Sequence, residues 1–146
     1  MKLVVSAREG GTTAGTVGMN VYFNTEIVTT TNYSITGLLG TGASTSSDRT
    51  SSSGGLFFGN ITPNAAQTTN TFSNVELYIP NYTGSNFKSC ILDSVNENNA
   101  TAAYQRLYAG LWRSTAAIST LSIYSGAANF AQYSTFALYG VLRQGI

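Results

Sequence analysis

The stretch Asn74-Val75-Glu76-Leu77-Tyr78-Ile79-Pro80 decides the fold class, because its apolar and polar residues alternate at a period of two. In an extended segment Val75, Leu77 and Ile79 fall on one face, and the two residues between them fall on the other. Such alternation is typical of a half-buried β-strand. Pro80 has no backbone N–H to donate, so we expect the strand to end there.

The same period recurs in three later segments, at residues 107–111, 121–123 and 136–142. Turn-forming residues separate such runs, as at residues 80–84 and 125–127. Several short strands between turn signals predict an antiparallel sandwich or barrel. We therefore expect an all-β, jelly-roll-like antiparallel β-sandwich.

The composition changes along the chain, although its length of 146 residues suits one domain. Residues 1–36 predict an extended polar N-terminal arm with the first strands, and residues 37–146 predict the sandwich module. Within that module residues 37–55 are rich in Ser, Thr and Gly and can bury little, which predicts a long loop. A short helix competes with strand only at residues 99–107, where Asn99 would cap it.

Charged residues make up only 9% of the chain, against about 25% in an ordinary soluble domain. This low charge is typical of a protein that lies in contact with neighbouring subunits. The net charge is +1 and there is no basic cluster, so we expect no nucleic-acid partner. No apolar run approaches the roughly 20 residues of a membrane span.

The residues that commonly carry catalysis are scarce. The chain has no histidine, which removes the commonest general base and the usual zinc ligands. Its only cysteine, Cys90, precedes Ile91-Leu92 and so predicts a buried, unreactive thiol. We expect neither enzymatic activity nor a cofactor.

Two alternatives depend on the acidic segment 93–99. Asp93 and Glu97 lie four residues apart, and a pair of carboxylates at one site is what glycoside hydrolysis requires. Oxygen ligands in the same segment could also hold a calcium ion, although the spacing is not that of an EF-hand. Both alternatives rank below a structural role, since clusters of Asn, Asp and Glu are usually turns.

Aromatic residues make up 12% of the chain, and Tyr and Trp are favoured at protein interfaces. Trp112, flanked by Arg106, Tyr108 and Arg113, predicts an interface or a cation–π cluster. The alternative, that Trp112 belongs to the core, remains equally open. Tyr139 is a further interface candidate. Tyrosines on a sheet also bind sugars, so a glycan-binding tip is possible.

The C-terminal half resembles a recurring β-module of tailed-phage virion proteins. The resemblance covers about residues 75–146. It is carried by Leu77-Tyr78-Ile79-Pro80-Asn81-Tyr82, by residues 93–101 and 109–118, and by residues 126–141 with the ending Ser134-Thr135-Phe136-Ala137-Leu138-Tyr139-Gly140. It implies a jelly-roll structural module without catalytic residues, found in head decoration or cement proteins and in tail-fibre or tail-tip proteins.

The resemblance and the composition lead to one expectation and one alternative. The chain has no fibre shaft and no coiled-coil heptads before the module, which favours a compact capsid subunit. We therefore expect a capsid decoration or cement protein of the virion that forms a homotrimer and binds the major capsid protein. The alternative is a tail-fibre or tail-tip module that binds a host receptor or glycan.

Overall fold

The computed structural model describes residues 1–12, 16–26, 31–99 and 103–142. In these ranges the chain forms ten β-strands and no helix, which confirms the predicted all-β class. The strands are β1 (Lys2–Ala7), β2 (Val17–Phe23), β3 (Tyr33–Gly40), β4 (Thr45–Ser53), β5 (Leu56–Thr62), β6 (Ser73–Tyr78), β7 (Lys88–Asn96), β8 (Tyr104–Trp112), β9 (Leu121–Ser125) and β10 (Thr135–Tyr139).

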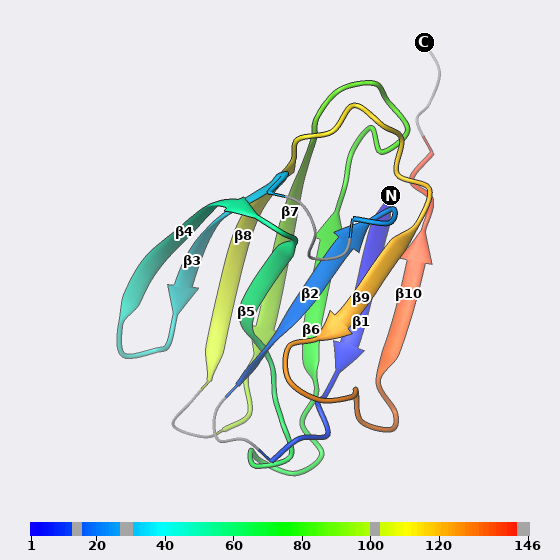
Figure 1. Cartoon of the computed structure of the whole chain (residues 1–146). Helices are drawn as coiled ribbons and strands as arrows, with labels where there is room; N and C mark the ends of the chain where they lie inside the picture. Colours follow the sequence, from blue (N-terminus) through cyan, green and yellow to red (C-terminus); the bar gives the residue numbers. More distant parts are fainter. Residues whose placement is uncertain (13–15, 27–30, 100–102, 143–146) are drawn as a thin grey trace.

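Two antiparallel sheets form the predicted sandwich. Seven strands make the larger sheet in the order β10-β1-β6-β7-β8-β3-β4, and the smaller sheet has the order β5-β2-β9. The smaller sheet lies across one face of the larger one (Figure 1). Three antiparallel pairs are nested in the sequence, so that the first strand pairs with the last and so on inward. They are β1 with β10, β2 with β9 and β3 with β8. Nested pairing is a jelly-roll feature, although a regular jelly roll has eight strands.

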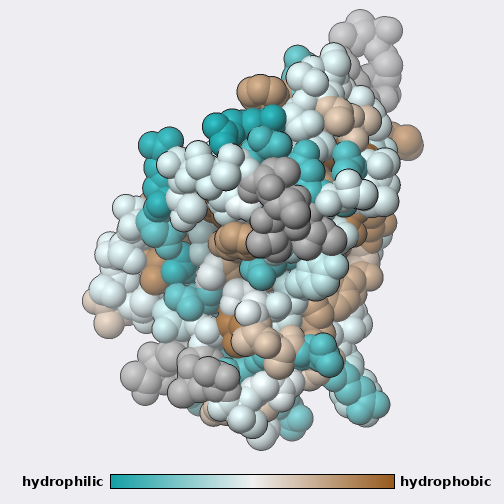
Figure 2. Space-filling view, in the orientation of Figure 1, coloured by the Kyte–Doolittle hydropathy of each residue, from teal (hydrophilic) through white to brown (hydrophobic). Residues whose placement is uncertain are grey.

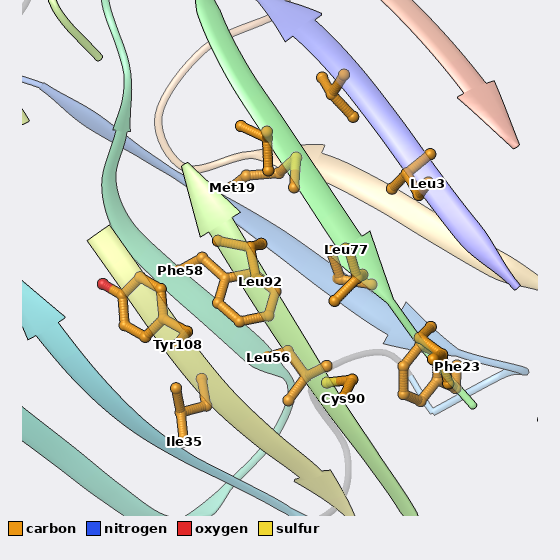
Figure 3. Close-up of a cluster of buried hydrophobic side chains, with 14 of the residues drawn as sticks. Leu3, Met19, Phe23, Ile35, Leu56, Phe58, Leu77, Cys90, Leu92 and Tyr108 are labelled. Carbon is orange, nitrogen blue, oxygen red and sulfur yellow. The ribbon is translucent and has the colours of Figure 1, made fainter. Parts of the chain in front are cut away.

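The core lies between the two sheets and follows from the period-two patterns. Burial alternates along β6 and along all nine residues of β7. Leu77 and Leu92 of the larger sheet face Met19, Leu56 and Phe58 of the smaller one, and all five side chains are fully buried (Figure 3). Each such side chain contributes about 1.5–3 kcal/mol to stability when it is removed from water.

Strand β8 replaces the helix considered at residues 99–107, and that interpretation was wrong for residues 104–107. β8 pairs with β7 on one side and with β3 on the other, so its backbone groups are bonded to both neighbours. Asn99 has a φ of 52° and its N–H donates to Glu97 Oε1 at 2.8 Å, which is a turn and not a helix cap. Residues 100–102 lie outside the described ranges.

The long loop predicted at residues 37–55 was also wrong, because most of this segment forms the edge hairpin β3–β4. The turn at residues 41–44 is closed by a hydrogen bond from the Thr41 N–H to the Ser44 carbonyl at 3.0 Å. Eight of the nine residues of β4 are exposed, so the low apolar content did indicate poor burial. Strand formation needed only backbone pairing with β3.

Nor do the first residues form an extended arm. β1 lies inside the larger sheet, between β10 and β6, and its Leu3, Val5 and Ala7 are buried. Its partners are far away in the sequence, since Val5 is paired with both Val75 and Phe136. Residues on both sides of position 36 therefore share one core cluster.

Candidate functional site

Trp112 lies in the core. Of the two interpretations of the sequence, an interface residue or a core residue, the structure supports the second. Its side chain is 1% exposed. The ring centroid lies 5.4 Å from that of Phe23 in an edge contact and 6.4 Å from that of Tyr33 in a stacked one. The indole Nε1 donates to Glu26 Oε2 at 2.8 Å. Trp112 therefore packs within its own subunit and offers no surface to a partner.

Arg106 and Tyr108 form an internal cation–π pair. The guanidinium carbon of Arg106 lies 5.2 Å from the centroid of the Tyr108 ring, and both residues are buried. Arg106 Nη1 donates to Asp48 Oδ2 at 2.6 Å and to the Tyr108 hydroxyl at 2.5 Å. That hydroxyl donates to the Gly59 carbonyl at 3.0 Å, and burial raises the pKa of Tyr108. The cluster ties β4 and β5 to β8.

A glycine makes room for this cluster. A Cβ at Gly37 would lie 2.5 Å from both the Tyr108 ring and the Asp48 carboxylate. Gly37 is paired with Asp48 on one side and Tyr108 on the other, so the missing side chain lets the two polar groups meet across β3.

The two remaining interface candidates lie at the surface, in different places. Arg113 is exposed and its guanidinium donates to the Thr31 carbonyl. The cation beside Trp112 is Lys88, whose Nζ lies 5.5 Å from the ring centroid. Tyr139 is exposed at the end of β10, on the far edge of the larger sheet.

The structure does not bring Asp93 and Glu97 together, so the paired-carboxylate interpretation was wrong. Asp93 lies within β7, and β7 continues to Asn96. Because the chain is extended through Asn96, it lacks the turn that would bring these two side chains together. Asp93 instead lies opposite Glu76 on the neighbouring strand β6. The Glu76 carboxylate lies 2.8 Å from Lys2 Nζ. Among the described residues no group of three His, Cys, Asp or Glu side chains could hold a metal ion.

Cys90 is buried in the core, as predicted. Burial raises the pKa of its thiol to about 12, so the nucleophilic thiolate is scarce at neutral pH.

The surface that stands out is the edge formed by β10. Phe136 and Leu138 face the same side of the larger sheet as their partners Val5 and Leu3. Nevertheless Phe136 is 41% and Leu138 56% exposed, whereas Val5 is 1% exposed. The smaller sheet ends at β9, and β10 runs beyond it at the edge of the sandwich (Figure 1). The inner face of β10 therefore lacks a covering strand.

Further exposed apolar residues lie on β10 or close to it in the chain, with Tyr139 on the outer face opposite Lys2, and we call the whole set the β10 surface. Its members are Tyr133, Phe136, Leu138, Tyr139, Val141 and Leu142. Residues 114–142 contain no charged side chain at all. In Figure 2 brown atoms gather along the side where β10 runs, whereas the opposite side is mainly white and teal.

The two edges of the larger sheet are thus different. β4 carries Asp48 and Arg49 among Ser and Thr residues, which protects an edge strand from pairing with other chains. β10 has no such protection, since its sequence is Thr-Phe-Ala-Leu-Tyr. The lack of charge at this edge could be seen in the sequence, in residues 114–142. That no strand covers β10 could not be seen there.

Comparisons of the chain with protein-family models, curated proteins and solved structures found no match. In the described ranges no helix is long and apolar enough to span a membrane.

Proposed function

We propose that this protein is a non-catalytic structural subunit of a tailed-phage virion. It decorates the head, self-associates as a trimer and stabilises the assembled lattice of the major capsid protein. The resemblance of residues 75–146 to phage β-modules supplies the biological setting. The observation that carries the proposal is the uncharged, apolar β10 surface, because it fits association with protein.

Self-association through the β10 surface is favoured by its chemistry. In a cyclic oligomer the residues nearest the axis meet their own copies, so a charged side chain there would face an identical charge. The residues of the β10 surface carry no charge that would repel the same surface on another copy. Phe136 and Leu138 are exposed apolar side chains, so their burial against another copy would be favourable. Three copies around one axis would provide this cover and would bury the unprotected strand edge.

The outer face of the larger sheet is a second surface, suited to the capsid lattice. Leu38 and Leu107 are paired across β3 and β8, and Ile91 and Tyr78 across β7 and β6; all four are exposed. The ion pair between Lys2 and Glu76 lies beside them. Asp93 lies opposite Leu107 and Lys2 lies opposite Tyr78, so this face combines apolar contacts with charges that a partner could match. Binding only the assembled lattice would stabilise that lattice by mass action.

The experiment compares particles with and without this subunit. Particles that lack it should assemble but open at a lower temperature, and added purified protein should restore them. The Ile91→Lys variant should bind such particles at least tenfold more weakly while it keeps the mass of the wild-type oligomer. Equal heat resistance of the two kinds of particle would contradict the proposal.

The alternative is a tail-fibre or tail-tip module that binds a host receptor or glycan. A cleft lined by tyrosines and amides at one end of the sandwich favours it. The number of copies per virion separates the two: many copies indicate a head subunit, and a few indicate a tail. Deletion particles that are as robust as complete ones but fail to adsorb to host cells would favour the tail.

A further inference from the structure

A cleft of about 810 Å³ lies at the end of the sandwich where β6 is connected to β7. One wall is the connection itself, with Asn81, Tyr82 and Asn86. The other walls are Tyr78, at the end of β6, and the segment after β10. The cleft thus lies within a single subunit.

The lining of the cleft limits the chemistry of its ligand. None of the described side chains that form it is charged, and the one charged group of its lining, the Met1 ammonium, already donates to the Ile79 carbonyl at 2.9 Å. The side chains of the cleft therefore offer no counterpart for a phosphate or carboxylate group. Asn81 and Asn86 offer amide donors and acceptors, and Ser85 offers a hydroxyl. Tyr78 and Tyr82 add ring faces together with hydroxyl groups. A sugar presents the matching groups, namely hydroxyls around its edge and C–H groups on its ring faces.

A buried lysine fixes the wall of the cleft. Lys88, at the start of β7, is 2% exposed. Its Nζ donates to the carbonyls of Gly84 at 2.7 Å, Ala116 at 2.5 Å and Ser114 at 3.4 Å. Three N–H donors therefore meet three carbonyls, and they join the β6–β7 connection to the segment after β8. Burial lowers the pKa of Lys88. Burying an ammonium group costs free energy. An ordinary surface loop does not require such a group, so we infer that the shape of this wall matters for function.

Backbone hydrogen bonds restrict the same wall further. The Gly84 N–H donates to the Asn81 carbonyl at 2.9 Å, and Asn81 has a φ of 48°. The Ile118 N–H donates to the Tyr82 carbonyl at 2.8 Å. A wall held in this way loses little conformational entropy when a ligand binds.

We propose that this cleft binds a neutral carbohydrate, with Tyr78 as the stacking surface and Asn81 and Asn86 as hydrogen-bonding groups. Lys88 is a positioning residue that holds the wall and does not touch the sugar. The inference rests on the alternative function given above, a module that binds a glycan, and specifies the site and the class of sugar; it does not require the capsid role, because the cleft is formed by one subunit.

The experiment probes folded protein with immobilised neutral oligosaccharides of glucose, galactose, mannose and N-acetylglucosamine, and with anionic polysaccharides beside them. We expect saturable binding to a neutral member that changes little between low and high salt. Tyr78→Ala and Asn86→Ala should each weaken this binding at least tenfold. The matched control Tyr124→Ala removes an exposed tyrosine of β9, outside both the cleft and the β10 surface, and should leave this binding unchanged.

Binding to none of the neutral members would overturn the inference, as would binding to the anionic ones only. Equal loss in Tyr124→Ala and Tyr78→Ala would place the site elsewhere and would also overturn it. Lys88→Met should weaken binding if it still folds; the two surface variants test the site even if it does not. The mass of the oligomer, measured on the same samples, separates a failure of this inference from a failure of self-association.

Discussion

Phe136 of β10 and Val5 of β1 are directly paired in the larger sheet and face the same side, yet Phe136 is 41% exposed and Val5 is 1% exposed. Neighbouring positions on one sheet face differ so much because the covering sheet has only three strands and ends at β9. Phe136 has one aromatic neighbour, Phe130, at 4.9 Å between ring centroids. The sandwich thus leaves apolar surface that a second molecule would cover.

Replacing Trp112 should affect folding before it affects assembly. Trp112→Ala removes a fully buried side chain that packs on Phe23 and Tyr33. We expect the free energy of unfolding to fall by about 3–5 kcal/mol, as for other large-to-small changes in a core. Chemical denaturation measures this change. Phe87→Ala, at an exposed position outside the β10 surface, is the control and should change stability little. A Trp112→Ala protein of normal stability would contradict the core assignment.

Stability should fall as the pH rises above 9. Burial raises the pKa of Cys90 from 9.0 to about 12 and that of Tyr33 from 10.0 to about 12. In this range the unfolded chain releases protons that the folded chain keeps, so the free energy of unfolding decreases between pH 9 and 12. Urea denaturation at several pH values measures the slope.

The Cys90→Ala variant separates this titration from the loss of packing. It should show a weaker pH dependence between pH 9 and 10 than the wild type. Val75→Ala also removes core volume but no titrating group, so it should lower stability by a similar amount at every pH. The same pH dependence in Cys90→Ala and wild type would show that the thiol does not contribute.

Glu9 is a buried acidic side chain, and its replacement tests whether such a group costs stability. It is fully buried, and within the described part of the chain neither carboxylate oxygen has a hydrogen-bond partner. Glu9→Gln replaces it with a neutral group of the same shape, which costs less to bury. We expect the free energy of unfolding at pH 8 to rise by about 1 kcal/mol or more, measured by chemical denaturation. A clear loss of stability would mean that the carboxylate has a partner.

The sequence was informative for some of the strands that bury one face, although it missed the alternation along β7. Alternation at a period of two predicted β6 and β9 and the middle of β8 and β10. Alternation failed to predict β4, because this strand contains no apolar residues that could alternate with polar ones. β4 is held by backbone pairing to β3. Alternation also failed for β1, because its partners β6 and β10 lie far away in the sequence.

The candidate surface could be predicted only in part. In β8 the alternation separated Leu107 from Tyr108 but could not tell which face is buried, and the buried face turned out to carry Arg106 and Trp112. Arg106 can be buried because Asp48 and the Tyr108 hydroxyl accept its hydrogen bonds. The absence of charge in residues 114–142 was legible in the sequence. The missing cover over β10 follows from the arrangement of the sheets, which no local pattern contains.

The molecular mass of the protein in solution tests the central claim most directly. Light scattering should give three times the 15.4 kDa chain mass for the wild type. Leu138→Lys places a charge on the exposed inner face of β10 and should give the mass of a monomer with an unchanged β-sheet spectrum. Ser47→Lys, on the opposite edge strand β4, is the control and should keep the wild-type mass. A wild-type monomer at every concentration, or a Leu138→Lys protein with the wild-type mass, would contradict self-association through the β10 surface.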